Sequence, residues 1–320
     1  MNAPQTIDVR VAAVIDEAED IRSFELVDPN GELLPAFTAG AHIDVHLAEK
    51  LIRQYSLCND PSERQRYVIG VLHDPQGRGG SRAIHDLKAG DSLRISAPRN
   101  QFELSSEGTS LLIAGGIGIT PILSMAYSLA AAGRLFDLHY ATKTRSRTAF
   151  MERIRSSGFA PSVSHYWSQE PDGEKLDLGQ LLQSPEADAH LYVCGPRSFM
   201  DAAIQTAKEK GWIEAQIHHE FFAGEVVRLE SDDTFMVQLA GSGKTIPIAP
   251  DKTVVEALAE VGIEVPTSCE QGICGTCLTG VVSGEPDHRD MFLTPEEQAC
   301  NDKFLPCCSR SKSSLLVLDL

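Results

Sequence analysis

Up to about residue 100, the chain carries short segments in which apolar and polar positions alternate, separated by turn residues such as Asp28-Pro29-Asn30-Gly31. A period of two is typical of strands that bury one face. The pattern predicts six strands, at residues 7–15, 21–27, 42–47, 53–58, 66–72 and 92–96. Six short strands in so short a stretch predict a small antiparallel β-barrel.

From residue 110 short apolar runs alternate with helical segments. Strands are predicted at 111–114, 136–141 and 190–193, and helices at 122–132 and 199–210. This alternation is typical of a doubly wound α/β domain with a parallel sheet. Residues 109–133 contain no charged residue, but Gly115, Gly116, Gly118 and Pro121 interrupt them. A buried strand, a turn and a helix are therefore expected there, not a membrane span.

A polar and acidic stretch at residues 223–233 reads as a linker. Beyond it we predict strands at 235–240, 245–248 and 314–320, with a helix at 254–261. These elements form a compact α+β module. The chain is thus predicted to be multidomain, with an antiparallel β-barrel at 1–105, an α/β doubly wound nucleotide domain at 106–224 and an α+β domain at 232–320.

Cysteines give the strongest chemical signal. Four residues separate Cys269 from Cys274, two separate Cys274 from Cys277, and twenty-nine separate Cys277 from Cys307. This C-x4-C-x2-C pattern with a distant fourth thiolate is the plant-type spacing for a [2Fe–2S] cluster. The adjacent Cys308 would lengthen the last gap by one residue, so Cys307 is favoured as the fourth ligand and Cys308 stays open.

The loop between these cysteines also suits a cluster, because Gly272 and Gly275 allow the backbone to wrap around it. A zinc site usually takes two short Cys pairs or a Cys/His mixture, and only Cys274 and Cys277 form such a pair. A disulfide set would require an exported protein. The N-terminus shows neither a basic nor an apolar signal region, so a reducing, cytoplasmic location is expected.

Charge excludes one broad class of function. The formal net charge of −17 argues against a nucleic-acid-binding protein, which needs a basic face. Residues 232–320 hold fourteen Asp and Glu against six Lys and Arg, a net of −8. Such an acidic domain could be steered towards a basic patch on an electron acceptor, although ordinary solubility explains it equally well.

Two barrel segments suggest a phosphorylated flat ligand. In a strand, Arg53 and Tyr55 share one face and would present a guanidinium beside an aromatic ring. The glycine-rich run from Gly77 to Ser81 precedes a segment that can start a helix, an arrangement that can bind phosphate. A surface arginine or a simple turn explains either segment alone, but both fall in one predicted barrel.

In the α/β region, the turn Gly115-Gly116-Ile117-Gly118-Ile119-Thr120-Pro121 is not the G-x-G-x-x-G fingerprint, because no third glycine follows. A glycine-rich turn between a strand and a helix can still present amides to a pyrophosphate. The run Tyr192-Val193-Cys194-Gly195-Pro196 ends a strand where such sheets bind ligands. A small buried hydrophobic residue is the alternative role for Cys194.

Taken in order, these motifs resemble the phthalate dioxygenase reductase family, the flavin and iron–sulfur reductases of two-component Rieske oxygenases. The resemblance covers essentially the whole chain. It rests on the runs 53–57, 79–81, 112–121 and 192–196 and on the cysteine set. It implies a flavin barrel, a ferredoxin-reductase-like NAD domain and a C-terminal plant-type, ferredoxin-like [2Fe–2S] domain. Its partner would be a terminal Rieske-type oxygenase that receives electrons from NADH.

The resemblance also implies residue roles. FMN would be held by a set of barrel residues, namely Arg53, Tyr55, Ser56, Gly79, Gly80 and Ser81. The pyridine nucleotide would lie on the glycine turn and the strand end, namely Gly115, Gly116, Gly118, Thr120, Cys194, Gly195 and Pro196. Phe222 would lie over the flavin, so Thr120, Cys194 and Phe222 are the candidate catalytic residues. The resemblance places Cys307 as the fourth cluster ligand.

The nucleotide preference is open in the sequence. The basic run Thr142-Lys143-Thr144-Arg145-Ser146-Arg147 could bind the 2′-phosphate of NADPH, or it could be a solvated loop. The resemblance favours NADH, and either Asp137 or Glu152 could contact the ribose. The alternative function is a flavin-free iron–sulfur redox sensor or carrier, against which a yellow supernatant with flavin fluorescence after heat precipitation would argue.

Overall fold

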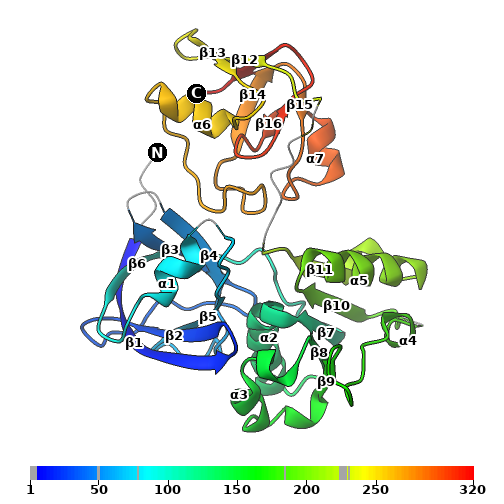
Figure 1. The fold of residues 1–320 in the computed structure, drawn as a ribbon. Helices are drawn as coiled ribbons and strands as arrows, with labels where there is room; N and C mark the ends of the chain where they lie inside the picture. Colours follow the sequence, from blue (N-terminus) through cyan, green and yellow to red (C-terminus); the bar gives the residue numbers. More distant parts are fainter. Residues whose placement is uncertain (1–5, 49–50, 78, 184, 223–228, 230) are drawn as a thin grey trace. The chain divides into compact units, whose positions relative to one another are not determined.

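The computed structural model describes residues 6–48, 51–77, 79–183, 185–222, 229 and 231–320. The backbone divides into two compact units, Met1–Phe222 and Ala223–Leu320. Figure 1 shows the elements of both units. Most of the predicted linker at 223–233 lies outside the described residues. The finer domain bounds predicted from the sequence stay a prediction.

The N-terminal half of the first unit is the predicted antiparallel barrel. Its six strands run in the order β4-β3-β6-β1-β2-β5, and an antiparallel bridge between Leu57 and Ile69 joins the two edges. The helix α1 (Gly80–His85) follows β5. The strands are β1 (Thr6–Ala18), β2 (Ile21–Val27), β3 (His42–Ala48), β4 (Leu51–Ser56), β5 (Tyr67–Leu72) and β6 (Ser92–Ser96).

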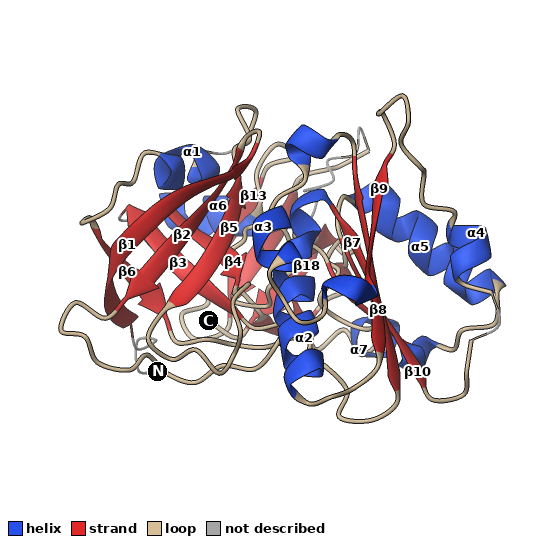
Figure 2. Cartoon of the chain, turned by 90° about the horizontal axis from the view of Figure 1, so that it is seen from below, coloured by secondary structure: helices blue, strands red, loops and turns tan. Residues whose placement is uncertain are grey.

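The second half of this unit is the predicted parallel sheet, in the order β11-β10-β7-β8-β9. Figure 2 shows helices on both sides of it. The strands are β7 (Thr109–Gly115), β8 (Phe136–Thr142), β9 (Val163–Trp167), β10 (Ala189–Cys194) and β11 (Ile217–Glu220). The helices are α2 (Ile119–Ala131), α3 (Met151–Arg155), α4 (Leu178–Leu181) and α5 (Arg197–Glu209), with short 3-10 turns at Gly116–Gly118, Arg145–Arg147, Ala160–Ser162 and Glu214–Gln216.

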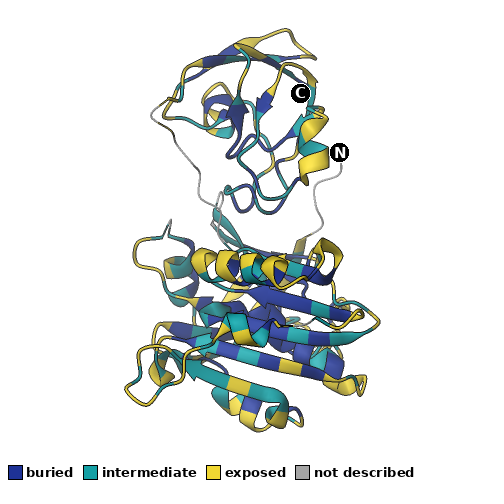
Figure 3. Cartoon of the chain, turned by 90° about the vertical axis from the view of Figure 1, so that its right-hand side faces the viewer, coloured by how far each residue is buried: buried dark blue, intermediate teal, exposed yellow. Residues whose placement is uncertain are grey.

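The sheet is covered on both faces because consecutive residues of β7 point to opposite sides. Leu112 and Ala114 pack into the core that contains α2, whereas Ile113 packs into the core that contains α5. The three central strands, β7, β8 and β10, hold most of the buried residues of this sheet, and buried positions are dark blue in Figure 3. Strands β9 and β11 were not predicted from the sequence. Both are short edge strands with several polar residues, so their apolar signal is weak.

The second unit is the predicted α+β module. Its main sheet has the order β13-β12-β18-β14-β16, and a small ladder pairs β15 with β17. The strands are β12 (Phe235–Leu239), β13 (Thr245–Ile248), β14 (Thr279–Ser283), β15 (Pro286–Asp287), β16 (Lys303–Phe304), β17 (Arg310–Ser311) and β18 (Leu315–Leu318). The helices are α6 (Val254–Glu260) and α7 (Pro295–Ala299). Among the described residues, no helix has the length and apolar character needed to cross a membrane.

Candidate functional site

The two barrel motifs predicted from the sequence meet in the structure. Arg53 and Tyr55 lie half-buried on β4. Gly80 opens α1, and a Cβ atom at this position would lie 2.5 Å from Cγ of Arg53. Gly79, just before the helix, has φ +83°, a conformation that favours glycine. The arginine stem therefore passes directly over the glycine loop, as a phosphate site built from both would require.

Ser81 has a structural contact as well. Its Oγ accepts a hydrogen bond from the Asp74 backbone N–H at 3.0 Å, which ties the glycine loop to the end of β5. Arg78, inside the same loop, lies outside the described residues. The loop is thus held at both ends, by Asp74 on one side and by α1 on the other.

The predicted glycine turn and strand end also meet, at the carboxyl edge of the parallel sheet. A Cβ atom on Gly195 would lie 3.0 Å from Cα of Gly115, and one on Gly118 would lie 2.3 Å from the Cys194 carbonyl oxygen. No larger residue fits at Gly118 unless the backbone shifts. Strands β7 and β10 end side by side here, and the chain leaves β7 towards β8 on the other side. Such switch points are where open α/β sheets bind ligands.

Thr120 and Phe222 lie where the nucleotide sheet meets the barrel. The Thr120 hydroxyl donates to the Ile117 carbonyl oxygen at 3.1 Å. Its methyl group faces Gly70 on β5, where an added Cβ would come within 2.8 Å of it. Phe222 packs against the core cluster that contains Cys194. The three candidate catalytic residues are therefore near the same junction, although the Thr120 hydroxyl is bonded to the 3-10 turn that precedes α2.

The structure adds a carboxyl group to which the sequence assigned no role. Glu220 ends β11 beside Cys194 in the parallel register. Its Oε2 accepts a hydrogen bond from the Ser56 hydroxyl of the barrel at 3.1 Å, and its side chain is only 17% exposed. Burial raises the pKa of Glu220 to about 7, although the Ser56 hydrogen bond opposes the shift. A glutamate between two histidines and two phenylalanines, at the end of a strand, was the available sequence signal.

Cys194 is fully buried beside this carboxyl group. Burial, and then the charge of Glu220, raise the pKa of the Cys194 thiol well above its ordinary value. The thiol therefore stays protonated at neutral pH. It is not a thiolate nucleophile.

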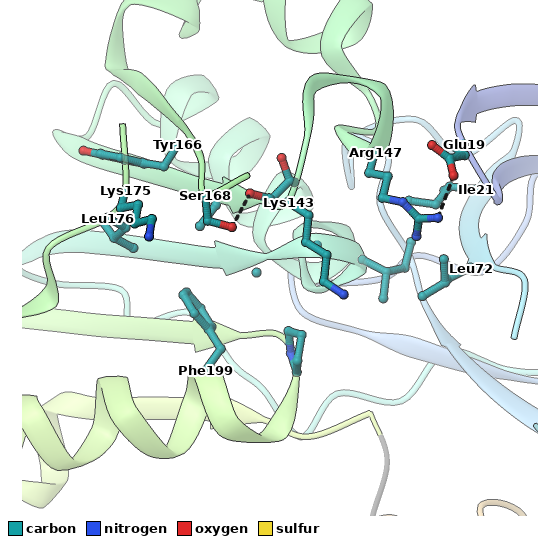
Figure 4. A pocket seen from close by; sticks show the side chains of 16 residues that line it. Glu19, Ile21, Leu72, Lys143, Arg147, Tyr166, Ser168, Lys175, Leu176 and Phe199 are labelled. Atoms are coloured by element: carbon teal, nitrogen blue, oxygen red, sulfur yellow. Dashed lines mark hydrogen bonds and ion pairs between the residues drawn. The ribbon is translucent and has the colours of Figure 1, made fainter. Parts of the chain in front are cut away.

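A cavity of about 480 Å³ opens at the same edge (Figure 4). It is large enough for part of a dinucleotide. Its walls come from the barrel, the glycine turn, the ends of β8 and β9 and the start of α5. They include Glu19, Ile21, Leu72, Gly115, Gly116, Ile117, Thr142, Lys143, Arg147, Tyr166, Ser168, Lys175, Leu176, Pro196 and Phe199. Neither Asp137 nor Glu152, the two ribose candidates, is among the lining residues.

Two arginines of the basic run are paired with carboxylates. Arg145 makes two parallel hydrogen bonds to Asp172, at 3.0 and 3.1 Å, and its guanidinium lies 4.3 Å from the centre of the Trp167 ring. Arg147 donates to Glu19 at 2.6 Å, a contact visible in Figure 4. Their positive charges are thus already matched within the protein.

In the second unit the four predicted ligands are buried, and hydrogen bonds join Cys269 to Cys274 and Cys277 to Cys307, with Cys308 bonded to Cys307 as well. The hydrogen bond from Cys269 lowers the pKa of Cys274, and the hydrogen bond from Cys277 lowers that of Cys307. In the described part of the chain, no group of three or more His, Cys, Asp or Glu side chains could hold a single metal ion. Two separate pairs suit a two-iron cluster, in which four thiolates are shared by two irons.

The backbone around these thiols leaves no room for larger residues. Gly272 and Gly275 have φ of +73° and +69°. A Cβ atom at Gly272 would lie 2.5 Å from Sγ of Cys308, and one at Gly275 would lie 2.3 Å from the Phe292 ring. The chain is therefore wrapped tightly at both glycines, as a cluster loop requires.

Cys308 is also buried, but its contacts differ from those of its neighbour. Its sulfur lies 3.7 Å from the Leu305 carbonyl oxygen and 3.7 Å from the Ser309 hydroxyl. Cys307 is hydrogen-bonded to the predicted ligand Cys277, which lowers its pKa most, and then to Cys308, whereas Cys308 is bonded to Cys307. This contrast supports Cys307 as the fourth ligand.

Comparison with known proteins finds three family models in sequence along the chain. Residues 8–104 match an oxidoreductase FAD-binding domain, residues 112–205 an oxidoreductase NAD-binding domain and residues 237–312 a 2Fe-2S iron-sulfur cluster binding domain. They confirm the three-domain architecture predicted from the sequence, with a flavin domain, a nucleotide domain and a cluster domain. The flavin-domain match also counts against a flavin-free carrier.

Relatives extend this similarity over the whole chain. The chain is 54% identical over 317 residues to the vanillate O-demethylase oxidoreductase of Pseudomonas putida, covering 98% of this chain and 100% of that one. A solved phthalate dioxygenase reductase, described as a modular structure for electron transfer from pyridine nucleotides to [2Fe-2S], is 39% identical with a TM-score of 0.78 and 98% coverage of both chains. An intact type IV self-sufficient cytochrome P450 monooxygenase is 38% identical with a TM-score of 0.84. It covers 98% of this chain, which spans only 41% of that protein.

Proposed function

The chain belongs to the phthalate dioxygenase reductase family, and from this premise we propose that it is the NADH-dependent FMN reductase of a two-component Rieske-type oxygenase. As in its relatives, it is the reductase component of an oxygenase system and an oxidoreductase with flavin, pyridine-nucleotide and [2Fe–2S] domains. FMN, NADH and the Rieske-type acceptor are the proposed refinements. A cytoplasmic location, suggested by eight cysteines without a disulfide, is a further part of the proposal.

One observation carries the proposal, namely the paired thiols Cys269/Cys274 and Cys277/Cys307 in a loop whose glycines admit no side chain. When bound, the flavin accepts two electrons from the nucleotide, and the cluster passes them on one at a time. The protein supplies position and order. Its cysteines would hold the cluster, while Arg53 and the loop at Gly79 and Gly80 would hold the flavin phosphate.

The junction residues have their own chemical task. Ser56 donates to Glu220, whose raised pKa of about 7 lets the carboxyl group hold or release a proton near neutral pH. The Ser56 hydroxyl can therefore exchange a proton with Glu220 beside the proposed flavin site. Thr120, Cys194 and Phe222 enclose this junction, and their proposed role is to exclude water and position the nicotinamide.

The ion pairs of Arg145 and Arg147 support NADH as the donor. A 2′-phosphate would have to displace Asp172 or Glu19 to reach either guanidinium, and it would meet their negative charge. Lys143 and Lys175 also line the cavity, and they remain available for the diphosphate that both nucleotides share. For the flavin, the short loop between β5 and α1 supports FMN, because its phosphate would end there.

An anaerobic titration of the purified full-length protein tests the proposal. NADH should bleach flavin and [2Fe–2S] bands together and deliver about three electrons per chain, two to the flavin and one to the cluster. Flavin released by heat should elute as FMN in chromatography. NADPH in a parallel cuvette should bleach the bands far more slowly. Cluster bands without flavin bands would contradict the flavin reductase. FAD in the released fraction would contradict FMN, and faster bleaching by NADPH would contradict NADH as the donor.

The acceptor needs its own experiment. The reduced protein should transfer electrons to a purified Rieske-type oxygenase and should not oxidise an aromatic acid on its own. Demethylation or hydroxylation by the isolated chain would overturn the assignment as a reductase component.

A further inference from the structure

A row of polar side chains crosses β3 and β4 on the face that carries Ser56. The antiparallel register places His42 opposite Ser56 and Asp44 opposite Gln54. His42, Asp44 and Ser56 are all buried. Buried polar groups are stable in a fold when they are hydrogen-bonded, so the contacts in this row decide which atoms carry protons.

The row begins at Arg99, which donates to Oδ2 of Asp44 at 2.7 Å. Nε2 of Gln54 donates to Oδ1 of the same carboxylate at 3.0 Å. An ionised carboxylate only accepts hydrogen bonds, so the amide nitrogen of Gln54, not its oxygen, faces Asp44. This fixes the orientation of the Gln54 amide.

That orientation determines the tautomer of His42. Nε2 of Gln54 lies 3.4 Å from Nε2 of His42. An amide nitrogen offers protons and accepts none, so Nε2 of His42 is the acceptor and its proton sits on Nδ1. Burial, and then the charge of Arg99, lower the pKa of His42 to about 4. The ring is therefore neutral at physiological pH, with a single donor.

The donor faces Glu220. Nδ1 of His42 lies 3.7 Å from Oε1 of Glu220, and the other oxygen, Oε2, accepts from Ser56 at 3.1 Å. The separation of 3.7 Å is slightly longer than a hydrogen bond. Such contacts at reaction sites often shorten once a ligand closes the site. The two carboxyl oxygens of Glu220 thus face residues of two neighbouring barrel strands, His42 of β3 and Ser56 of β4.

We propose that His42 is a positioning residue of the flavin–nucleotide junction, where its Nδ1–H orients the Glu220 carboxyl group so that Oε2 stays on the Ser56 hydroxyl. Three groups face this carboxyl among the described residues, namely His42 from β3, Ser56 from β4 and the protonated thiol of Cys194 from β10. Gln54 does not face the carboxyl group, but its amide nitrogen keeps the proton of His42 on Nδ1. The role of His42 in hydride transfer rests on the proposed function.

The proposal predicts the direction of two effects. A donor at Nδ1 favours the ionised form of Glu220, so removing it raises the pKa of that carboxyl group. Removing it also lets the carboxyl group rotate away from Ser56, which slows the step that depends on their alignment. Binding of the flavin phosphate at Gly79 and Gly80 should not change, because these residues are not part of the row.

The test compares variants of the full-length protein in single-turnover bleaching of the flavin by NADH. His42→Leu should slow bleaching about tenfold, as expected for one lost hydrogen bond, and should move the midpoint of its pH profile upward. His42→Asn places an amide donor near the former Nδ1 and should restore most of the rate. Gln54→Leu, which frees the tautomer, should fall between the two.

His46→Leu is the matched control, because His46 is half-buried on the same strand and is not part of this row. Its rate and pH profile should equal those of the unaltered protein. The inference is overturned if His42→Leu matches His46→Leu, or if His42→Asn is as slow as His42→Leu. A wild-type protein that no nucleotide bleaches would instead contradict the proposed function.

A second measurement does not depend on turnover. In the full-length protein with nitrogen-15-labelled histidine, the His42 resonances should show a neutral ring protonated at Nδ1, the less common tautomer. The resonance can be assigned by its disappearance in His42→Asn. Protonation at Nε2 would overturn the proposal even if every variant lost activity.

Discussion

In the cysteine loop, three of the four predicted ligands lie between Cys269 and Cys277, whereas the junction of barrel and nucleotide sheet is built from distant segments. Ser56, Cys194 and Glu220 come from three strands in two sheets, yet Ser56 and Cys194 both lie beside the Glu220 carboxyl group. The loop depends on local backbone shape. The junction depends on the register of whole strands.

This difference has a physical consequence for how each region tolerates change. In the loop, positive φ at Gly272 and Gly275 and the lack of space beside them determine where the thiols point. At the junction, residues of the strands β3, β4 and β11, none of which has a positive φ, are held by hydrogen bonds between strands. We therefore expect substitutions in the loop to weaken or abolish binding of the cluster, and substitutions at the junction to alter rates and pH dependence.

The largest effect is expected for the fourth thiolate. Cys307→Ser should lose nearly all of the cluster, because a serine oxygen is a poor replacement for a soft thiolate ligand. Cys308→Ser is the matched control and should keep the cluster, since the contact with Cys277 belongs to Cys307, whereas Cys308 contacts Leu305, Ser309 and Cys307. Iron and sulfide content per chain and the visible spectrum measure both. Cluster loss in Cys308→Ser with retention in Cys307→Ser would reverse the assignment.

The next largest effect is expected when a side chain is added to a glycine of the cysteine loop. Gly272→Ala adds a Cβ atom 2.5 Å from Sγ of Cys308 to a residue with φ +73°, so strain and overpacking together should cost about 3 kcal/mol. Gly243→Ala has a similar φ of +71° but open space, and should cost only about 1 kcal/mol. The urea concentration at which the cluster's visible absorbance is lost gives the comparison. Equal midpoints would show that space beside Gly272 does not matter.

At the junction, Glu220→Gln should change the pH dependence of stability. Because the folded pKa of about 7 lies above the ordinary 4.5, the folded protein binds this proton more tightly than the unfolded chain, so stability falls as pH rises from about 4.5 to 7. The variant removes this loss. It should exceed the unaltered protein by up to about 3 kcal/mol at pH 8 and lose that advantage below pH 4.5.

Urea unfolding of the cofactor-free protein across this pH range measures the Glu220 effect. A constant difference between the two proteins at every pH would show that the carboxyl group titrates normally. The same variant should also flatten the pH profile of flavin bleaching near pH 7. The cluster content should stay unchanged, which separates this region from the cysteine loop.

The smallest effect is expected in the basic run at residues 142–147, where the ion pair between Arg145 and Asp172 is exposed. Asp172→Asn should leave Arg145 with only its longer ion pair to Glu170, at 3.7 Å, and raise kcat/KM for NADPH by up to about fivefold, since exposed ion pairs are worth up to about 1 kcal/mol. Glu214→Gln breaks a comparable exposed pair with Lys208 and should leave the NADH/NADPH ratio unchanged. Steady-state kinetics with both nucleotides make the comparison. If Asp172→Asn left the NADH/NADPH ratio of kcat/KM unchanged, the ion pair between Arg145 and Asp172 would have no part in selecting the nucleotide.

Much of the fold could be predicted from the sequence because the signals are local. The strand bounds 21–27 and 92–96 are confirmed to the residue, whereas the turn predicted at 115–121 is too long, because its last three residues belong to α2. Helix α2 begins at Ile119, before the predicted residue 122, because Pro121 fits the first turn of a helix. Strand β9 was missed, since at the edge of the sheet most of its residues are half-buried and give no clear periodicity.

The sequence by itself determined the sites that depend on spacing: the four cysteines, the glycine turns and the order of three domains. Only the tertiary structure decided the sites at which residues from distant segments come together. It brought Arg53 onto Gly80, Glu220 onto Ser56, and Asp172 onto Arg145. Spacing is a property of the chain and can be read along it. The raised pKa of Glu220 arises from burial and from strand register, which exist only once distant segments have packed together.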